Sequence, residues 1–380
     1  MGKKIKNTVL LVSLILNFTF ISIVISPYVA KIYYQETFAG IDKKTDINLV
    51  EKKVRKAVIR VLDGKTASDE SVIYYHTMED FLRHTLKGRL FDASKYGEFG
   101  YALYYTYKYA QIKDDKELKI YVKEQVNNRV LTNGEFEIER VDQYSYGCLF
   151  LELDKEWPNK IYKKAAEKIY KHALNMFEES GQLLYANGYH DMQVDAIGLG
   201  IPFLYLYAQD NPSSKAEEIA DTTMHRFIRY GIDRVTGLPA QGYNIDSKIK
   251  TGFSCWGRGA AWLATGILFM KHTVPEDSLV IDQFNKTLLK SNGVFCQYIG
   301  DTHSQPDMSA TIPLLTYLIE KGLVQFTKEE IFDLLSSYIE NDGSIRFCTP
   351  SISRPFEKPN AFQTGMMVQS QLLYLLSIAK

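Results

Sequence analysis

The chain has 380 residues, of which 46% are hydrophobic, and its 45 basic side chains are balanced by 45 acidic ones. A net charge of zero gives no electrostatic basis for binding nucleic acid, and the apolar fraction is too high for a disordered chain. The four cysteines lie more than 40 residues apart with no C-x-x-C pair, which excludes a zinc framework and a disulfide-stapled miniprotein. We therefore expect free, buried thiols at Cys148, Cys255, Cys296 and Cys348.

The N-terminal segment predicts a membrane anchor. Lys3, Lys4 and Lys6 precede an uncharged stretch at 8–30, and its 23 residues are long enough to span a bilayer. The positive-inside rule keeps such an N-terminus in the cytoplasm, so the rest of the chain would be extracytoplasmic. A cleaved signal peptide is the alternative, although its apolar region is normally shorter and the small residues here make a poor cleavage site. Residues 31–46 would form a tether.

The remaining residues, 47–380, predict one domain built from two alternating kinds of helix. No linker rich in Pro, Gly or Ser divides this part of the chain. The first kind is amphipathic and charged, and is expected at 47–62, 116–130, 159–177, 214–230, 276–291 and 328–339. The second kind is apolar on nearly every face, and is expected at 100–110, 144–153, 194–208, 256–270, 309–319 and 364–379.

This alternation predicts the fold class. A helix that is apolar all round must be buried, whereas a helix with one apolar stripe covers a core and faces water. Six helices of each kind therefore predict an all-α (α/α)6 toroid, with an inner ring inside an outer ring. The inner helices would begin near residues 98, 142, 195, 256, 309 and 362. In an antiparallel array these starts open on one side, where we expect the functional mouth.

Polar and aromatic residues gather at the predicted inner-helix starts, namely Asp142, Asp195, Trp256, Arg258 and Ser309. Helix capping is the ordinary explanation for a single aspartate, because Asp is a preferred N-cap and gains from the helix dipole. Two acids, an arginine and tryptophans at one mouth also fit a concave ligand site, which combines aromatic walls with convergent polar groups. A sugar ring is the natural ligand for such a site.

Two motifs carry a resemblance to a known family. Asp195 is followed by Pro202-Phe203, as in a D-G-x-x-M-x-x-P-F stretch, and the run from Trp256 to Trp262 matches W-x-R-G/A-x-x-W. Weaker matches follow the same order, at Val141-Asp142-Gln143, Asp233-x-x-Thr236-Gly237-Leu238 and Ser309-Ala310. On these residues most of 47–379 resembles the unsaturated glucuronyl and rhamnogalacturonyl hydrolases, families 88 and 105 of the glycoside hydrolases. The resemblance implies an (α/α)6 barrel.

The resemblance also implies a reaction, the hydration of a vinyl ether. Substrates of these enzymes carry a C4=C5 double bond in the uronic acid at the non-reducing end, left there by a polysaccharide lyase. By position, Asp195 would protonate C4 and then act as a base while water adds at C5. Asp142 would orient the water or tune its partner. A second carboxylate and a dry mouth both favour a protonated acid, and the hemiketal formed would open and expel the rest of the glycan.

The same resemblance assigns residues to substrate binding. Arg258 would neutralise the substrate carboxylate or anchor hydroxyl groups, and Trp256 or Trp262 would stack on a sugar ring. Ser309, at the start of the fifth inner helix, is also expected to contact the substrate.

Four further positions need separate interpretations. Gln241 stands where the family often has a histidine, so it can form hydrogen bonds but cannot carry a proton. Ala260-Ala261 replaces a bulkier pair and would widen the pocket. His190 is either a proton shuttle or an ordinary loop histidine bonded to backbone. Asp191 becomes a rival catalytic acid if the helix carrying Asp195 starts before it, since residues four apart share a helix face.

Neither a metal nor a cofactor is expected, because no H-E-x-x-H or EF-hand pattern occurs. The expected partners are an oligosaccharide with an unsaturated uronic acid and, through 8–30, the membrane. Two other functions remain open. One is a non-catalytic, membrane-tethered protein for glycan binding or polysaccharide assembly, and the other is a different (α/α)6 glycosidase or an epimerase. Epimerases of this shape work with histidines, and only His190 lies near an inner-helix start.

Overall fold

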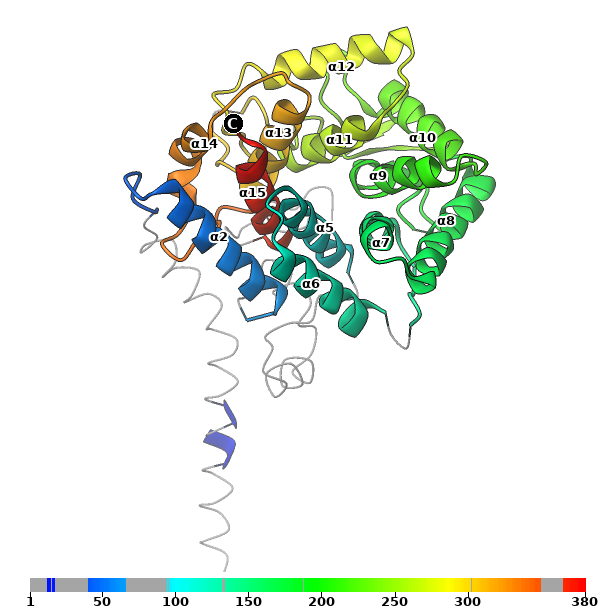
Figure 1. The fold of residues 1–380 in the computed structure, drawn as a ribbon. Helices are drawn as coiled ribbons and strands as arrows, with labels where there is room; N and C mark the ends of the chain where they lie inside the picture. The colour runs from blue at the N-terminus through cyan, green and yellow to red at the C-terminus, as the bar shows by residue number, and fades with distance from the viewer. Residues whose placement is uncertain are drawn as a thin grey trace, which may run out of the picture. The chain divides into compact units, whose positions relative to one another are not determined.

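The computed structural model describes residues 12–14, 16–17, 40–65, 94, 96–131, 134–186, 188–301, 303–349 and 365–380. The chain divides into two compact units, Met1–Gly40 and Ile41–Lys380. The second unit is mostly helical and carries every predicted site residue (Figure 1).

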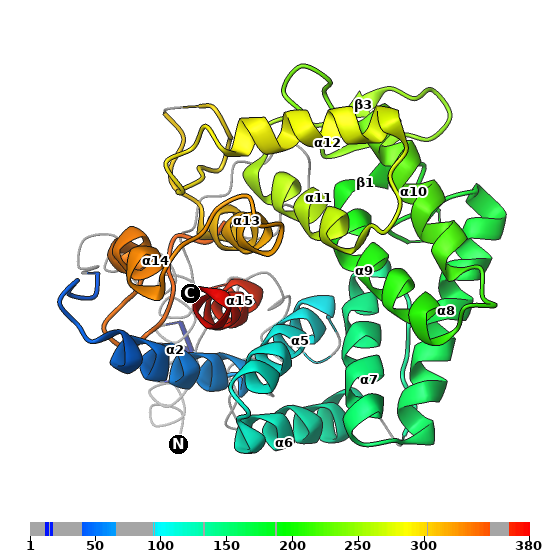
Figure 2. The same cartoon turned by 45° about the horizontal axis from the view of Figure 1, so that its top comes forward.

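The centre of the second unit is a ring of buried helices. They are α5 (Gly97–Ile112), α7 (Tyr144–Glu156), α9 (Val194–Asp210), α11 (Gly257–Phe269), α13 (Met308–Glu320) and α15 (Met366–Ile378). Each packs against the next in this order, and α15 packs against α5, so the ring is closed (Figure 2). These helices bury residues on nearly every face, as their apolar sequences require.

A second set of helices covers the outside of this ring (Figure 2). They are α2 (Ile47–Leu62), α6 (Lys116–Gln125), α8 (Lys160–Ser180), α10 (Ala216–Gly231), α12 (Pro275–Leu288) and α14 (Lys328–Leu335). Two of them end in tighter or wider turns: the π-helical η1 (Val126–Val130) continues α6, and the 3-10 helix η3 (Ser336–Tyr338) continues α14. The predicted toroid of six helical hairpins is therefore confirmed, with each helix within a few residues of its expected bounds.

Four of the six outer helices, α2, α6, α8 and α14, start with a side-chain cap. The caps are Asp46 on α2, Asp115 on α6, Asn159 on α8 and Thr327 on α14, each accepting a hydrogen bond from a backbone N–H of the first turn. Among the inner helices of the described chain, only α13 has such a cap, which Asp307 provides. Asp195 is not an N-cap, so the capping explanation does not account for it.

A small antiparallel sheet lies beside the start of α9. Its strands are β1 (Asp191–Gln193), β2 (Gly242–Asn244) and β3 (Lys250–Thr251), in the order β1-β2-β3. The N–H of Val194, the first residue of α9, donates to the carbonyl of Gln241 at 2.9 Å and so extends the pairing of β1 with β2. The sheet thereby fixes the direction in which the chain enters the helix that carries Asp195.

The predicted anchor at 8–30 falls mostly outside the described residues, which include only 12–14 and 16–17 of it. Across the described parts of the chain, no helix combines the length and the apolar character needed to cross a membrane. The four cysteines all belong to the described residues and are free thiols. Cys148 and Cys348 are buried as expected, whereas Cys255 and Cys296 are half-buried.

Candidate active site

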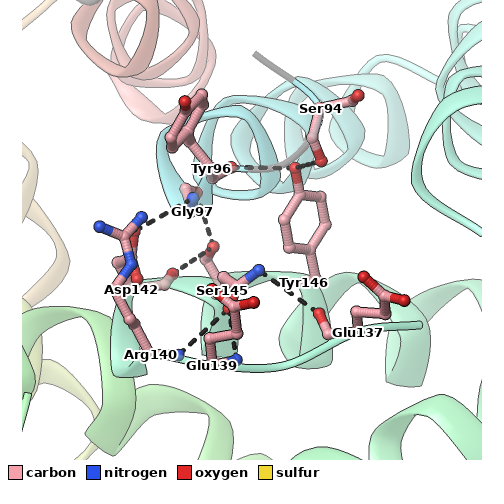
Figure 3. A network of polar contacts seen from close by, with 10 residues as sticks. Ser94, Tyr96, Gly97, Glu137, Glu139, Arg140, Asp142, Ser145 and Tyr146 are labelled. Carbon is pink, nitrogen blue, oxygen red and sulfur yellow. Dashed lines mark hydrogen bonds and ion pairs between the residues drawn. The ribbon is translucent and has the colours of Figure 1, made fainter. Parts of the chain in front are cut away.

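Asp142 lies in η2 (Val141–Gln143), a single 3-10 turn directly before α7. Its side chain is buried, with 2% of the residue exposed, and its Oδ2 accepts hydrogen bonds from Nη2 of Arg140 at 3.1 Å and from the N–H of Gly97 at 3.4 Å (Figure 3). Gly97 begins α5, so this oxygen also satisfies a backbone donor at that helix start. The other oxygen, Oδ1, has no hydrogen-bond partner among the described residues.

The turn that carries Asp142 is held against the start of α5 (Figure 3). The hydroxyl of Ser145 lies 2.7 Å from the carbonyl oxygen of Gly97 and 3.0 Å from that of Asp142. The hydroxyl of Tyr146 donates to the carbonyl of Tyr96 at 2.9 Å. A Cβ at position 97 would come within 2.0 Å of the Asp142 carbonyl oxygen, so only glycine permits this approach. The position of Asp142 thus depends on the packing of η2 and α7 on α5.

Asp195 is the second residue of α9 and keeps part of its surface open. Protein nevertheless surrounds it closely, and burial raises the pKa of its carboxyl to about 6. The negative charge of Asp142 acts in the same direction, while the guanidinium of Arg258 and the indole N–H of Trp262 lower the pKa. Among the described residues Asp195 makes no ion pair, so it is suited to hold a proton near neutral pH.

The two carboxyl groups therefore differ in their surroundings. Burial also raises the pKa of Asp142, but the charge of Arg140 and the N–H of Gly97 oppose this effect. Asp142 has a cation in direct contact and Asp195 does not. A cation in direct contact favours the charged form of a carboxyl. The arrangement favours a charged Asp142 beside a protonated Asp195.

Arg258, in the first turn of α11, is only 4% exposed and points into the protein. Its Nη1 donates to the carbonyl of Thr349 at 3.0 Å, and its guanidinium lies 5.8 Å from the ring centre of Trp262. Its charge also acts on Asp195. The charge of Arg258 thus lowers the pKa of Asp195 and opposes the effect of burial.

Ser309 belongs to a buried network that supports Arg258. Its hydroxyl donates to Oδ1 of Asp307 at 2.7 Å, and the hydroxyl of Thr349 donates to Oδ2 of Asp307 at 2.7 Å. Asp307 also caps α13 through the N–H of Ser309 at 2.8 Å. The network fixes Thr349, whose carbonyl receives Arg258. The expected contact between Ser309 and substrate stays a prediction, since its hydroxyl is already engaged within the protein.

Trp262 packs across the ring of inner helices. A Cβ at Gly198 of α9 would come within 2.8 Å of the Cα of Trp262, which shows how closely α11 approaches α9 there. The indole also meets the ring of Tyr101 of α5 edge-on, with the ring centres 5.6 Å apart. Trp262 is 5% exposed, and its indole N–H has no geometric hydrogen-bond partner among the described residues.

Trp256 directly precedes α11 and is equally buried. The Cβ position of Gly259 lies 2.8 Å from its ring and 3.4 Å from the side chain of Val194, so the ring lies beside the residue that precedes Asp195. Its indole N–H is likewise without a partner among the described residues. The structure therefore brings both predicted tryptophans to the start of α9.

The loop and strand residues that lie beside the start of α9 differ in exposure and in hydrogen bonding. Gln241 supplies its carbonyl to Val194, and its side-chain Oε1 is buried without a partner in the described chain. His190 is exposed. Asp191 lies in β1 and accepts a hydrogen bond from Nδ2 of Asn244 at 3.0 Å. Since α9 begins only at Val194, the condition under which Asp191 would share a helix face with Asp195 is not met.

Tyr185 is a site residue that the sequence did not indicate. Its carbonyl accepts the N–H of Val141 at 3.0 Å, which ties it to the turn of Asp142. Burial raises the pKa of its hydroxyl, and the charges of Asp142 and Asp195 raise it further. A neutral phenol therefore faces both carboxylates. Tyr185 lies in an irregular segment before β1, where no helical or strand period marks it.

Gln297 and Arg140 were also missed. The carbonyl of Gln297 accepts the N–H of Gly257 at 2.8 Å, and its side-chain Nε2 is buried without a partner in the described chain. Arg140 stands two residues before Asp142, and this spacing of opposite charges was the one signal available in the sequence.

Several buried side-chain polar atoms, on residues at or near the starts of α7, α9 and α11, have no hydrogen-bond partner within the described chain. Within the described chain they include Asp142 Oδ1, Gln241 Oε1, Trp256 Nε1, Trp262 Nε1 and Gln297 Nε2. Native proteins leave few such atoms, so a local concentration of donors and acceptors is typical of a site that binds a polar ligand. The same described residues contain no group of three His, Cys, Asp or Glu side chains arranged to hold a metal ion.

Comparisons with known proteins identify related chains. The sequence profile of Glycosyl Hydrolase Family 88 matches residues 77–363, about three quarters of the chain. No curated protein sequence matches it.

Solved structures share the fold at low identity. A possible member of glycoside hydrolase family 105 from Klebsiella pneumoniae has a TM-score of 0.68 at 15% identity, covering 88% of this chain and 93% of that one. An unsaturated glucuronyl hydrolase specific for heparin has a TM-score of 0.61 at 15% identity, covering 88% and 97%. The unsaturated glucuronyl hydrolase from Bacillus sp. GL1 has a TM-score of 0.52 at 15% identity, covering 74% and 84%.

Proposed function

The chain belongs to glycosyl hydrolase family 88 and is therefore a glycoside hydrolase, and we propose that it hydrates the unsaturated uronic acid of oligosaccharides left by polysaccharide lyases. The resemblance predicted from the motifs is confirmed at the level of the family. Two of the similar structures are unsaturated glucuronyl hydrolases, which supports this substrate class. The observation that carries the proposal is a pair of acids, the buried Asp142 and the half-buried Asp195, of which only Asp142 has an ion-pair partner among the described residues.

In the proposed reaction Asp195 starts as the acid. It transfers its proton to C4 of the double bond, and the positive charge that develops at C5 is shared with the ring oxygen. Water then adds at C5 and gives a proton back to the Asp195 carboxylate, so one water molecule is added across C4=C5 and the enzyme is restored. The free Oδ1 of Asp142 is the acceptor that orients this water. The hemiketal opens and releases the remaining glycan.

We assign substrate binding to buried polar atoms that have no hydrogen-bond partner within the described chain. The indole N–H groups of Trp256 and Trp262 and the amide oxygen of Gln241 would bind sugar hydroxyls or the uronate carboxylate. Both tryptophans are 5% exposed, which favours hydrogen bonding by their indole N–H groups over the stacking of a sugar on an open ring face. A purely glycan-binding protein has no need to bury two acids with raised pKa values, since burial of a charge is costly. This cost favours an enzyme over the binding protein.

The test is incubation of the purified chain with unsaturated oligosaccharides made by different polysaccharide lyases. Hydration removes the double bond, so the ultraviolet absorbance of the substrate falls, and mass spectrometry detects the released glycan. The matched control is Asp195→Asn, which keeps the size of the side chain. Binding without loss of absorbance across the whole panel would instead support the glycan-binding protein.

We also propose that residues 8–30 anchor the enzyme in a membrane with the domain outside the cytoplasm, as their length and the preceding lysines predict. Protease added to intact cells should then remove the domain, and the mature protein should begin at or near Met1. A mature N-terminus near residue 27 or 31 would instead identify a cleaved signal peptide.

A further inference from the structure

We propose that Arg140 is a positioning residue that holds Asp142 in its charged form and directs the free oxygen of Asp142 toward the reacting water. The proposal rests on the proposed function for what Asp142 does in the reaction. The part that concerns the charge of Asp142 is independent of any substrate.

The geometry fixes one end of the Asp142 carboxylate. Nη2 of Arg140 and the N–H of Gly97 both donate to Oδ2, at 3.1 and 3.4 Å. Two donors on one oxygen, from two different segments of the chain, define the plane and the direction of the carboxylate (Figure 3). Oδ1 is then the atom that remains available for a ligand or for water.

Arg140 is itself held in place. The side-chain Oε1 of Gln143 accepts the backbone N–H of Arg140 at 3.2 Å and that of Glu139 at 2.8 Å. The guanidinium lies 5.9 Å from the ring centre of Tyr96, which belongs to the segment entering α5. Figure 3 shows the side chain of Arg140 beside Asp142, next to the start of α5 at Gly97. The four residues 140–143 therefore form a closed unit in which Gln143 holds Arg140 and Arg140 holds Asp142.

Asp142 depends on this cation. The groups that act on it or share its surroundings are Arg140 of the same segment, Gly97 and Glu98 of α5, Tyr185 before β1, and Asp195 of α9. Among the described residues no other cation forms an ion pair with Asp142. A buried carboxylate that loses its only ion-pair partner takes up a proton rather than remain charged. Without Arg140 we expect Asp142 to take up a proton and to lose the charge with which it would accept a hydrogen bond from water.

The experiment compares the Arg140→Gln and Arg140→Lys variants with the wild type, all as full-length protein. Arg234→Gln is the matched control. Arg234 is exposed and far in sequence from Arg140 and Asp142. The titration of Asp142 is followed by NMR of protein labelled with carbon-13 at the aspartate carboxyl groups, and the signal is assigned by its loss in Asp142→Asn. We expect the titration to move to higher pH in Arg140→Gln and to stay near the wild type in Arg140→Lys and Arg234→Gln. An unchanged titration in Arg140→Gln overturns the proposal.

Kinetics provide the second readout. The kcat of Arg140→Gln should fall about 10-fold or more, with the acid limb of its pH profile moved to higher pH, whereas a purely structural defect lowers activity at every pH. In an Asp142→Asn background Arg140→Gln should add little, because the two residues act as one unit. A raised KM with an unchanged Asp142 titration would show that Arg140 binds the substrate instead.

Failure of the proposed function is distinguishable from failure of this inference. If the wild-type protein has no hydration activity, the proposed function is refuted. The carboxyl titration still tests the role of Arg140 in that case. If Arg140→Gln does not fold, as judged by circular dichroism, Arg140→Met provides a neutral side chain of similar length for the same titration.

Discussion

The outer and inner helices of the toroid begin with the same kinds of residue but use them differently. At the outer helix α2, Asp46 is exposed, and one of its oxygens accepts the N–H groups of Asn48 and Leu49 at 3.1 Å each. At the inner helix α9, Asp195 caps nothing. An acid at a helix start is thus a structural residue when it caps its own helix, as Asp46 does, and a candidate for chemistry when it does not, as with Asp195.

The free-energy cost of desolvation also differs between an exposed helix cap and a buried carboxyl. An exposed cap loses little hydration, so its hydrogen bonds stabilise the helix by about 1 kcal/mol. A buried carboxyl without partners pays for desolvation, and its pKa rises as a result. Burial raises the pKa of both acids of the inner ring, of Asp142 despite its ion pair with Arg140 and of Asp195 without an ion pair among the described residues. The comparison predicts a loss of activity when the inner-ring acids are substituted and a loss of stability when an outer helix cap is substituted.

The largest effect is expected for Asp195→Asn. Asparagine keeps the size but cannot donate the proton, so kcat on an unsaturated uronide should fall by about 10²- to 10⁴-fold. Circular dichroism should show an intact fold, since no cap is lost. Asp191→Asn, in β1, should change kcat little. Near-normal hydration by folded Asp195→Asn would refute the mechanism, and activity lost only in Asp191→Asn would move the acid four residues upstream.

Asp142→Asn should be the next most severe change. The amide cannot carry the negative charge that raises the pKa of Asp195, and it accepts a weaker hydrogen bond from water. We expect kcat to fall by roughly 10²-fold, measured at saturating substrate so that binding and turnover are separated. A change confined to KM would show that Asp142 only binds the substrate.

The pH dependence follows from the acid role of Asp195. Because burial raises its pKa to about 6, kcat/KM should fall as the pH rises through that value and the acid loses its proton. An activity that continues to rise well above pH 6 would mean that Asp195 acts from its charged form.

The same pKa predicts an effect on stability. The carboxyl has a pKa near 3.8 when unperturbed and about 6 when folded, so the stability it contributes is complete below about pH 4 and is lost as the pH rises through 6. Asp195→Asn cannot ionise. Its Tm should therefore exceed that of the wild type above pH 6, and the difference should close toward pH 4, as thermal unfolding across this range can measure.

The smallest effect is expected in the outer ring. Asp46→Ala removes two hydrogen bonds at the start of α2 and should cost about 1 kcal/mol in the free energy of unfolding. Denaturant titration measures this loss, and kcat should not change. A large loss of kcat with little loss of stability would contradict the purely structural role of Asp46.

The sequence predicted the fold better than the site because the two depend on different information. Helix periodicity and burial are local, so the alternation of apolar and charged helices was enough to predict both rings. The acids Asp142 and Asp195 were found because they stand at helix starts. Arg140, Tyr185 and Gln297 lie in irregular segments, where the partner of a side chain depends on contacts between distant parts of the chain.

Closure of the inner ring has a consequence for how the chain folds. The hydroxyl of Tyr101 in α5 donates to Oε1 of Gln371 in α15 at 3.2 Å, across 270 residues of sequence. The last helix therefore covers a face of the first inner helix that must stay open while the chain is being synthesised. Contacts of such long range slow folding, since the intervening chain has to be ordered first. We infer that the ring completes only after release of the C-terminus, and that a truncation before Met366 leaves it open on both α5 and α13.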